Sequence, residues 1–212
     1  MAITFPVSLA TFFSNIGIAS CEFDLTEAYE TSETGGGEIL RADYGPRLWE
    51  GMATVKPYTA ELAEDVLARI RMLREARATF FVTPIHYPKP RDMLTGPVCT
   101  IDALGGDGRS LRLSGLANGS QLRRGDFLTF VYGSGPVRYA LHQLVEDALV
   151  SGGLTPFFEV IPAIRPGAVV SQTVALSAPF CKAIIVPASF QLGGMAPLIT
   201  RPGSFRWRQT LR

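Results

Sequence analysis

The residue types that most often catalyse reactions or bind metals are few in this chain and poorly spaced for either task. Its two histidines, His86 and His142, belong to no H-E-x-x-H motif, and its three cysteines include no C-x-x-C pair. Metal sites and nucleophile–base pairs need such groups close together. A Cys99 nucleophile with a histidine base would require the fold to bring distant residues into contact. The sequence therefore predicts no metal, no cofactor and no enzymatic activity.

Other segments that could bind ligands have simpler explanations. The glycine-rich segments 34–37 and 105–108 lack the phosphate-loop patterns and are typical of turns. Asp147 and Glu159 have no evident partner across a cleft, which a glycosidase would need. The four arginines of the C-terminus could contact nucleic acid beside Phe205 and Trp207. We favour the alternative in which these aromatic side chains face a core and Arg206 and Arg208 face solvent.

Charge is distributed unevenly along the chain, although its net value is +1. The first forty residues hold six carboxylates and no Lys or Arg. Segregated charge commonly faces a distinct partner. Glu27, Glu30, Glu33 and Glu38 surround the glycines of residues 34–37, so we expect a loop or a projecting hairpin. A solvated acidic loop is the simpler alternative.

The composition indicates a folded chain with many turns and few charges. Apolar residues make up 47% of its 212 residues, which excludes a disordered chain. Charged residues make up only 18%, against roughly 25% in a typical soluble domain. Burial of part of the surface against other subunits would explain this deficit. The 21 glycines and 15 prolines favour short strands over long helices.

The cysteines and the N-terminus bear on compartment. An odd number of widely separated cysteines argues against a disulfide framework and for folding in a reducing compartment. No apolar run reaches the roughly 18 residues that span a bilayer, so we expect no membrane insertion. The N-terminus superficially resembles a signal peptide. However, no basic residue precedes it and Pro6, Ser14 and Asn15 interrupt its apolar stretch, so we expect no export.

One segment, residues 59–77, predicts a helix. Thr59 is placed to act as its N-cap, and acidic residues lead while arginines follow, which complements the helix dipole. Apolar residues recur at spacings of four, four and three: Leu62, Val66, Ile70 and Leu73. Such a stripe marks one buried helix face. We therefore expect this face to pack on a sheet.

Much of the remaining chain predicts strands. The C-terminal segment alternates apolar residues with arginines, with only Gln209 out of place on the apolar side. Further strands are expected at residues 49–55, 78–84, 98–104, 110–114, 127–132, 157–161 and 168–176. Residues 140–150 fit either a short helix or a strand followed by a turn.

Two stretches rich in proline and glycine, residues 84–97 and 187–203, suggest domain boundaries. Only one strand follows the second stretch, and a lone strand must pair with an existing sheet. We therefore predict a mainly β fold: a sandwich or barrel with one flanking helix, built from residues 1–95 plus 190–212. A second β-rich domain, residues 98–187, is inserted in it.

Several patterns follow one another in an order that has a counterpart in a known family. They are Arg41-Ala-Asp-Tyr-Gly-Pro-Arg-Leu-Trp49, Gly51-x-Ala-Thr-Val55-x-Pro57, the charged helix, Ala78-Thr-Phe-Phe-Val-Thr-Pro84, Gly125-Asp-Phe-Leu-Thr-Phe130, Phe157-Phe-Glu-Val-Ile-Pro-Ala-Ile-Arg165 and Gly167-Ala-Val-Val170. Together they resemble the distal tail proteins of siphophages and gene transfer agents. The resemblance covers most of the chain and brings no catalytic motif.

The resemblance implies a structural protein of the virion tail, assembled in the bacterial host cytoplasm. Its copies would form a hexameric ring that joins the tail tube to the baseplate hub and leaves a lumen for DNA. The implied partners are further copies, the tail tube protein, the hub or baseplate protein and the tape measure protein. The first domain would resemble a tail-tube subunit, and the second would be a small OB- or galectin-like barrel. Glu27, Glu30, Glu33 and Glu38 would line the lumen or contact a ring.

Two alternatives stay open at this point. Another tail component, such as a tube, terminator or hub-associated subunit, would share the same ancestral domain. A carbohydrate-binding β-sandwich at a tail tip or in a secretion system is a different class of protein. Exposed aromatic residues around a groove would favour carbohydrate binding, whereas a sixfold or threefold ring would favour the tail.

Overall fold

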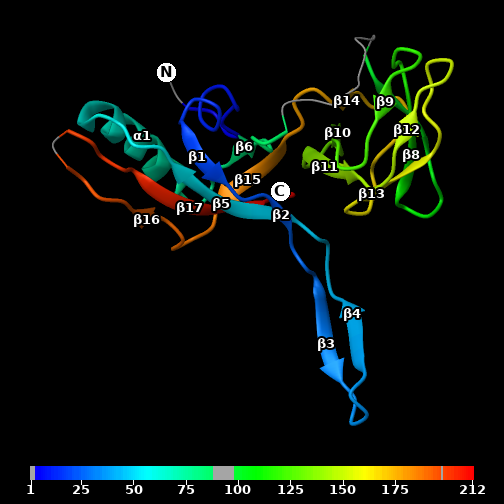
Figure 1. Cartoon of the computed structure of the whole chain (residues 1–212), viewed down its shortest axis with the longest axis horizontal. Coiled ribbons are helices and arrows are strands. Elements are labelled where there is room, and N and C mark those ends of the chain that lie inside the picture. Colours follow the sequence, from blue (N-terminus) through cyan, green and yellow to red (C-terminus); the bar gives the residue numbers. More distant parts are fainter. Residues whose placement is uncertain (1–2, 88–97, 197) are drawn as a thin grey trace.

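The computed structural model describes residues 3–87, 98–196 and 198–212 (Figure 1). Much of the proline-rich stretch expected at residues 84–97 lies outside these ranges. The described chain is mainly β, with one helix, a half-open first sheet and a nearly closed second sheet, which confirms the predicted fold class. A two-stranded arm extends away from both sheets (Figure 1).

The first sheet is antiparallel and draws its strands from both ends of the chain. Its main path runs through five strands: β1 (Ile18–Cys21), β5 (Trp49–Val55), β17 (Gly203–Gln209), β15 (Cys181–Ile185) and β6 (Phe80–Val82). Two short strands extend it: β2 (Asp24–Leu25) pairs with β5, and β16 (Gln191–Leu192) pairs with β17. The C-terminal strand is therefore an inner strand of this sheet.

The alternation in β17 explains its central place. Phe205 and Trp207 are fully buried, whereas Arg206 and Arg208 point to solvent, as the period-two pattern predicted. Gln209 occupies the buried face although it is polar. Its Oε1 accepts a hydrogen bond from the Trp49 amide at 3.2 Å, and its Nε2 donates one to the Tyr139 carbonyl at 3.3 Å. Both ends of the buried amide are thus satisfied.

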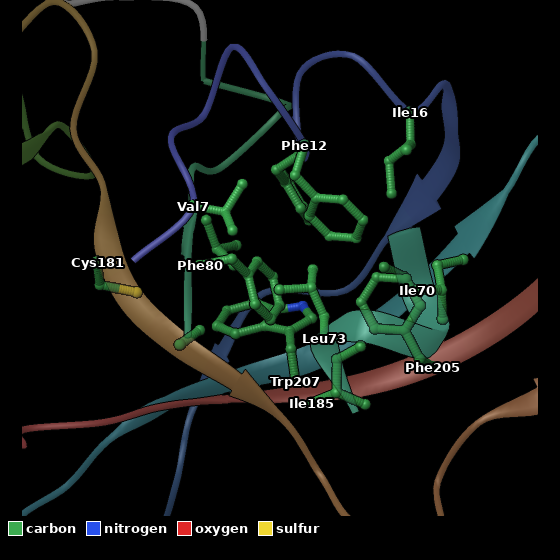
Figure 2. Close-up of a cluster of buried hydrophobic side chains, with 14 of the residues drawn as sticks. Val7, Phe12, Ile16, Ile70, Leu73, Phe80, Cys181, Ile185, Phe205 and Trp207 are labelled. Carbon is green, nitrogen blue, oxygen red and sulfur yellow. The ribbon is translucent and has the colours of Figure 1, made fainter. Parts of the chain in front are cut away.

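The helix α1 (Ala60–Leu73) covers one face of the first sheet, and the N-terminal loop packs beside it. Figure 2 shows Phe12 and Ile16 of that loop beside Ile70, Leu73, Phe80 and the aromatic residues of β17. The helix ends four residues earlier than predicted. The amides of Arg74 and Glu75 bond back to Arg71 and Met72, and the chain then turns into β6.

The predicted helix face needs one correction. Val66, Ile70 and Leu73 are buried as expected, but Leu62 is 56% exposed. The buried set is Ala63, Val66, Leu67, Ile70 and Leu73. Steps of four residues overshoot the helical period by about 40° each, so a stripe extended in fours rotates off the packed face. Ala63 and Leu67 take the place that Leu62 was expected to fill.

The second sheet coils into a nearly closed barrel with its own core. Its order is β14 (Val174–Ala175), β10 (Phe127–Tyr132), β11 (Arg138–Leu144), β13 (Phe158–Ile161), β8 (Ser110–Ser114) and β7 (Thr100–Leu104). A bridge from Thr100 to Thr173 brings β7 back beside the segment that leads into β14. The short strands β9 (Gln121–Leu122) and β12 (Ala148–Leu149) form a separate pair.

The structure also decides one open alternative and corrects two sequence expectations. The strand alternative for residues 140–150 is confirmed, because β11 runs to Leu144 and β12 follows it. Within residues 168–176, only β14 is a strand, and Val169 and Val170 are exposed. The chain returns to the first sheet at β15 rather than near residue 190. Cys181, Ala183 and Ile185 are buried in the first core, so residues 187–203 connect strands within that sheet.

The two β bodies are joined by bonded contacts, not only by the chain. The Trp49 Nε1 donates to the Leu141 carbonyl at 2.7 Å. The Thr129 hydroxyl donates to the Phe180 carbonyl at 2.9 Å and accepts from the Phe180 amide at 2.8 Å. Phe127 and Leu141 of the barrel belong to the first core.

Candidate functional site

The most distinctive surface feature is the arm, defined here as residues 29–43. Strand β3 (Tyr29–Glu33) pairs with β4 (Ile39–Asp43) in an antiparallel register that runs from Tyr29↔Asp43 to Glu33↔Ile39. The Thr34 amide donates to the Glu38 carbonyl and the Gly37 amide to the Thr34 carbonyl, both at 2.9 Å. Gly37 has a φ of 81°, a conformation that favours glycine.

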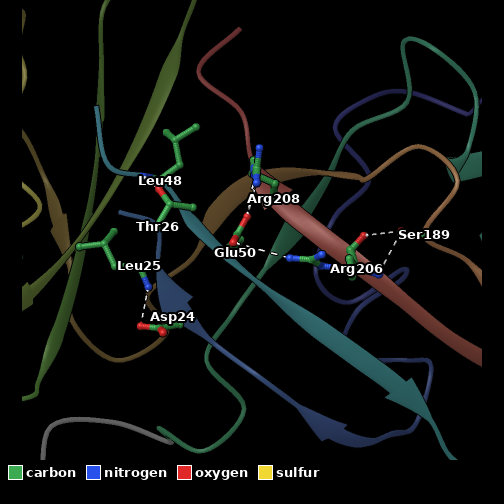
Figure 3. A network of polar contacts seen from close by, with 8 residues as sticks. All are labelled: Asp24, Leu25, Thr26, Leu48, Glu50, Ser189, Arg206 and Arg208. Carbon is green, nitrogen blue, oxygen red and sulfur yellow. Dashed lines mark hydrogen bonds and ion pairs between the residues drawn. The ribbon is translucent and has the colours of Figure 1, made fainter. Parts of the chain in front are cut away.

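The base of the arm is held closed by residues just outside it (Figure 3). The Thr26 amide donates to the Leu48 carbonyl at 2.8 Å, and the Leu48 amide donates to the Thr26 hydroxyl at 2.9 Å. Arg47 Nε adds a bond to the Thr26 carbonyl at 3.0 Å. Short strand β2 anchors this base on β5. The arm is therefore a hairpin on a fixed root.

Three of the four glutamates singled out in the sequence lie on the arm, and the fourth lies at its base. Glu30 and Glu33 are on β3, Glu38 precedes β4, and Glu27 lies at the base. All four are exposed, and no ion pair within the described residues joins them to Lys or Arg. The expectation of a projecting acidic hairpin agrees with this geometry. Whether these glutamates face a lumen or a neighbouring ring stays a prediction.

The arm has the properties of a contact surface. It packs on neither core, and its strands pair only with each other among the described residues. Ile39 and Leu40 at its tip are 59% and 51% exposed. A two-stranded hairpin alone is marginally stable in water, and open strand edges are templates for further pairing. The arm would therefore gain stability if another chain covered it.

A cleft of about 420 Å³ opens at the base of the arm, and it was not predicted from the sequence. Arg47, Arg109 and Arg165 contribute to its lining, together with Asp43. Its opposite wall is residues 160–166, the end of β13 and the loop after it. We call this the arginine cleft. Its three arginines come from segments distant in the sequence, so no local motif reveals it.

The solvent face of β17 is partly neutralised (Figure 3). Arg208 binds the Glu50 carboxylate through Nη2 at 2.6 Å and Nε at 2.7 Å, and Arg206 approaches the same carboxylate at 3.8 Å. Phe205 and Trp207 are fully buried, so they offer no stacking surface for bases. The interpretation of a core-facing aromatic side and a solvated arginine side is confirmed.

The cysteines and His142 are placed for packing. Burial raises the pKa of Cys21 to about 11 and that of Cys99 to about 12, and it also raises the pKa of fully buried Cys181. These thiols are protonated at neutral pH, which makes them poor nucleophiles. His142 is buried in the barrel, and its Nδ1 donates to the Pro162 carbonyl at 2.7 Å. No group of His, Cys, Asp or Glu among the described residues is arranged to hold a metal.

The buried imidazole predicts a pH-dependent stability. Burial lowers the pKa of His142 from 6.5 to about 4, with a smaller effect from the Arg165 charge. Below pH 6.5 the imidazole of His142 binds a proton in the unfolded chain but stays neutral in the folded chain. Its contribution to the free energy of unfolding is therefore constant above pH 6.5 and falls as the pH is lowered toward 4. The loss from this group should approach about 3 kcal/mol. Urea unfolding across this range measures it.

Two histidine variants separate this effect from other titrations. His142→Gln should remove the loss between pH 6.5 and 4, whatever it does to stability at pH 7. The exposed His86 serves as the control, and His86→Gln should retain the loss. An unchanged pH profile in His142→Gln would contradict the assignment.

The arginine cleft and a second cleft of about 330 Å³ beside the end of α1 have no aromatic residue in their described lining. Phe157 and Tyr44 are exposed large aromatics, and neither lines these clefts. No helix in the described part of the chain is long and apolar enough to cross a membrane.

Comparison with known proteins identifies no family for this chain, so the proposed function depends on the sequence patterns and on the geometry of the structure. No protein-family model matches the chain, and no curated protein matches it in sequence.

Proposed function

We propose that this chain is a structural protein of a virion tail, a distal tail protein whose copies form a hexameric ring between the tail tube and the baseplate hub. The arm is the observation that carries the proposal. It is an exposed ribbon with open edges and apolar residues at its tip, built on a fixed root. A neighbouring copy that covers it would satisfy both its edges and its apolar side chains.

The placement of the arm is compatible with a ring. The arm extends away from both β bodies (Figure 1), and in the proposed ring the arm of each copy meets the body of the next. Such a head-to-tail contact generates a ring when the rotation between neighbours closes. The low content of charged residues, 18%, supports extensive burial between copies. The order of six comes from the resemblance of the sequence patterns.

The acidic arm also suits a duct for DNA. Carboxylates in a lumen repel phosphates, so that DNA passes without salt-sensitive adhesion. In this account the partners are the tail tube protein, the hub or baseplate protein and the tape measure protein. DNA passes through the lumen without specific binding, and the protein catalyses no reaction. A tube, terminator or hub-associated subunit would use the same arm, and its neighbours would decide its position.

Negative-stain imaging of the purified full chain tests the proposal. We expect rings of sixfold symmetry with an open centre. A threefold ring would point to another tail component, such as a hub-associated subunit. Particles of the size of one chain at every concentration would contradict the proposal.

A further inference from the structure

The arginine cleft concentrates positive charge that the described fold does not neutralise. Arg47 lies at the exit of the arm, Arg109 in the β7–β8 turn, and Arg165 in the loop after β13. No ion pair in the described part of the chain joins any of the three to a carboxylate. Asp43 is the acidic residue in the lining. An anionic partner that enters the cleft would therefore meet three positively charged guanidinium groups and only one carboxylate, that of Asp43.

Arg165 is the least hydrated member of the set. It is half-buried, and it also lines a small recess beneath the cleft beside Tyr132 and His142. Burial lowers the pKa of Arg165; the nearby Tyr132 offsets part of this effect, and the Arg138 charge lowers the pKa further. The Tyr132 hydroxyl and His142 Nε2 in this recess make no hydrogen bond within the described structure. A half-buried cation without a counter-charge is costly, and an incoming carboxylate relieves that cost.

The complementary group is present on the same chain. The arm carries one arginine and four exposed carboxylates, of which Glu30, Glu33 and Glu38 lie away from its root and Asp43 lies at it. The tip residues Ile39 and Leu40 are exposed as well. The far wall of the cleft includes Ile161, Pro162, Ile164 and Pro166. Charge and apolar surface thus match between arm and cleft.

A chain cannot fill its own cleft with its own arm. The cleft lies at the root of the arm, and the paired strands extend away from that root (Figure 1). Each chain therefore offers one arm and one cleft, which is the requirement for a head-to-tail contact. We propose that the arginine cleft is the docking site for the acidic arm of the neighbouring copy, inserted so that Glu30 on one face of the ribbon, Glu33 on the other and Glu38 at the turn come within reach of Arg47, Arg109 and Arg165. This contact rests on the proposed ring.

Two charge-reversal variants of the full chain test the contact. The cleft variant combines Arg47→Glu and Arg109→Glu, both at exposed positions. The arm variant combines Glu30→Lys, Glu33→Lys and Glu38→Lys. Each alone should raise the concentration at which half of the chains are assembled by at least about tenfold. The matched controls reverse exposed charges on or after α1, Arg77→Glu and Glu61→Lys, and should leave assembly unchanged.

The decisive measurement is a mixture of the two variants in equal amounts. Within a mixed ring, each acidic arm meets an arginine cleft and each lysine arm meets a glutamate cleft. Native mass measurement should therefore show assembly restored in the mixture, with the two chains alternating. Thermal unfolding of each variant confirms that it is folded.

The outcomes separate this contact from the proposed function. If the wild-type chain forms rings and the mixture fails to recover them, the arm does not dock in the cleft, and the ring itself stands. The same conclusion follows if either variant assembles like wild type, as it would if the cleft held only a free anion. If the wild-type chain never assembles, both proposals are contradicted.

Discussion

A chain in which a two-residue Asn-Gly turn replaces residues 30–42 is expected to fold normally and to form none of the proposed rings. Tyr29 and Asp43 are directly paired at the root, so a two-residue turn can connect them. The residues removed belong to neither core. The free energy of unfolding should therefore change by no more than about 1 kcal/mol. Size-exclusion chromatography and thermal unfolding measure the two effects.

A point substitution at the tip of the arm is the control for this shortening. A Cβ added at Gly36 would meet only the Thr34 hydroxyl, at an ordinary contact distance of 3.9 Å. Gly36→Ser should therefore keep both the fold and the ring. A shortened chain that assembles like wild type would show that the arm makes no essential contact between copies.

Ile70→Ala is expected to lower the free energy of unfolding by about 2–5 kcal/mol, because it leaves a cavity between α1 and the first sheet. Ile70 is fully buried in the first core (Figure 2). Leu62→Ala removes a similar side chain from an exposed position on the same helix and should change stability by no more than about 0.5 kcal/mol.

Urea unfolding in the arm-shortened chain is the suitable measurement for this pair. Assembly would add to the apparent stability by an amount that rises with the logarithm of the concentration, and shortening the arm removes that contribution. An equal decrease in the free energy of unfolding in Ile70→Ala and Leu62→Ala would contradict the assignment of Leu62 to the solvent face.

The sequence predicted best those strands that are marked by apolar–polar alternation and by turn residues at their own ends. Strands β5, β8 and β10 begin and end where alternation and turn residues place them. The segment 168–176 failed because Val169 and Val170 face solvent, and β propensity acts only where a neighbouring strand is available. Strand β15 was assigned to the wrong body because the proline- and glycine-rich stretch after it is a connection within one sheet.

The arm and the arginine cleft likewise differ in how far the sequence could predict them. The arm could be anticipated because its carboxylates and its turn glycines are contiguous in sequence. The arginine cleft could not, because Arg47, Arg109 and Arg165 meet only after the barrel packs beside the root of the arm. Leu67 was overlooked on α1 because the stripe was extended in steps of four. The arginine cleft and the burial of Leu67 both depend on tertiary packing, which the local sequence does not reveal.

Native mass measurement of the purified full chain tests the central claim most directly. Across a concentration series, we expect a species of six times the 23.0 kDa chain, which dissociates as salt is raised. The arm-shortened chain should give only the single-chain mass under the same conditions. A wild-type chain that remains at the single-chain mass up to its solubility limit would contradict the account.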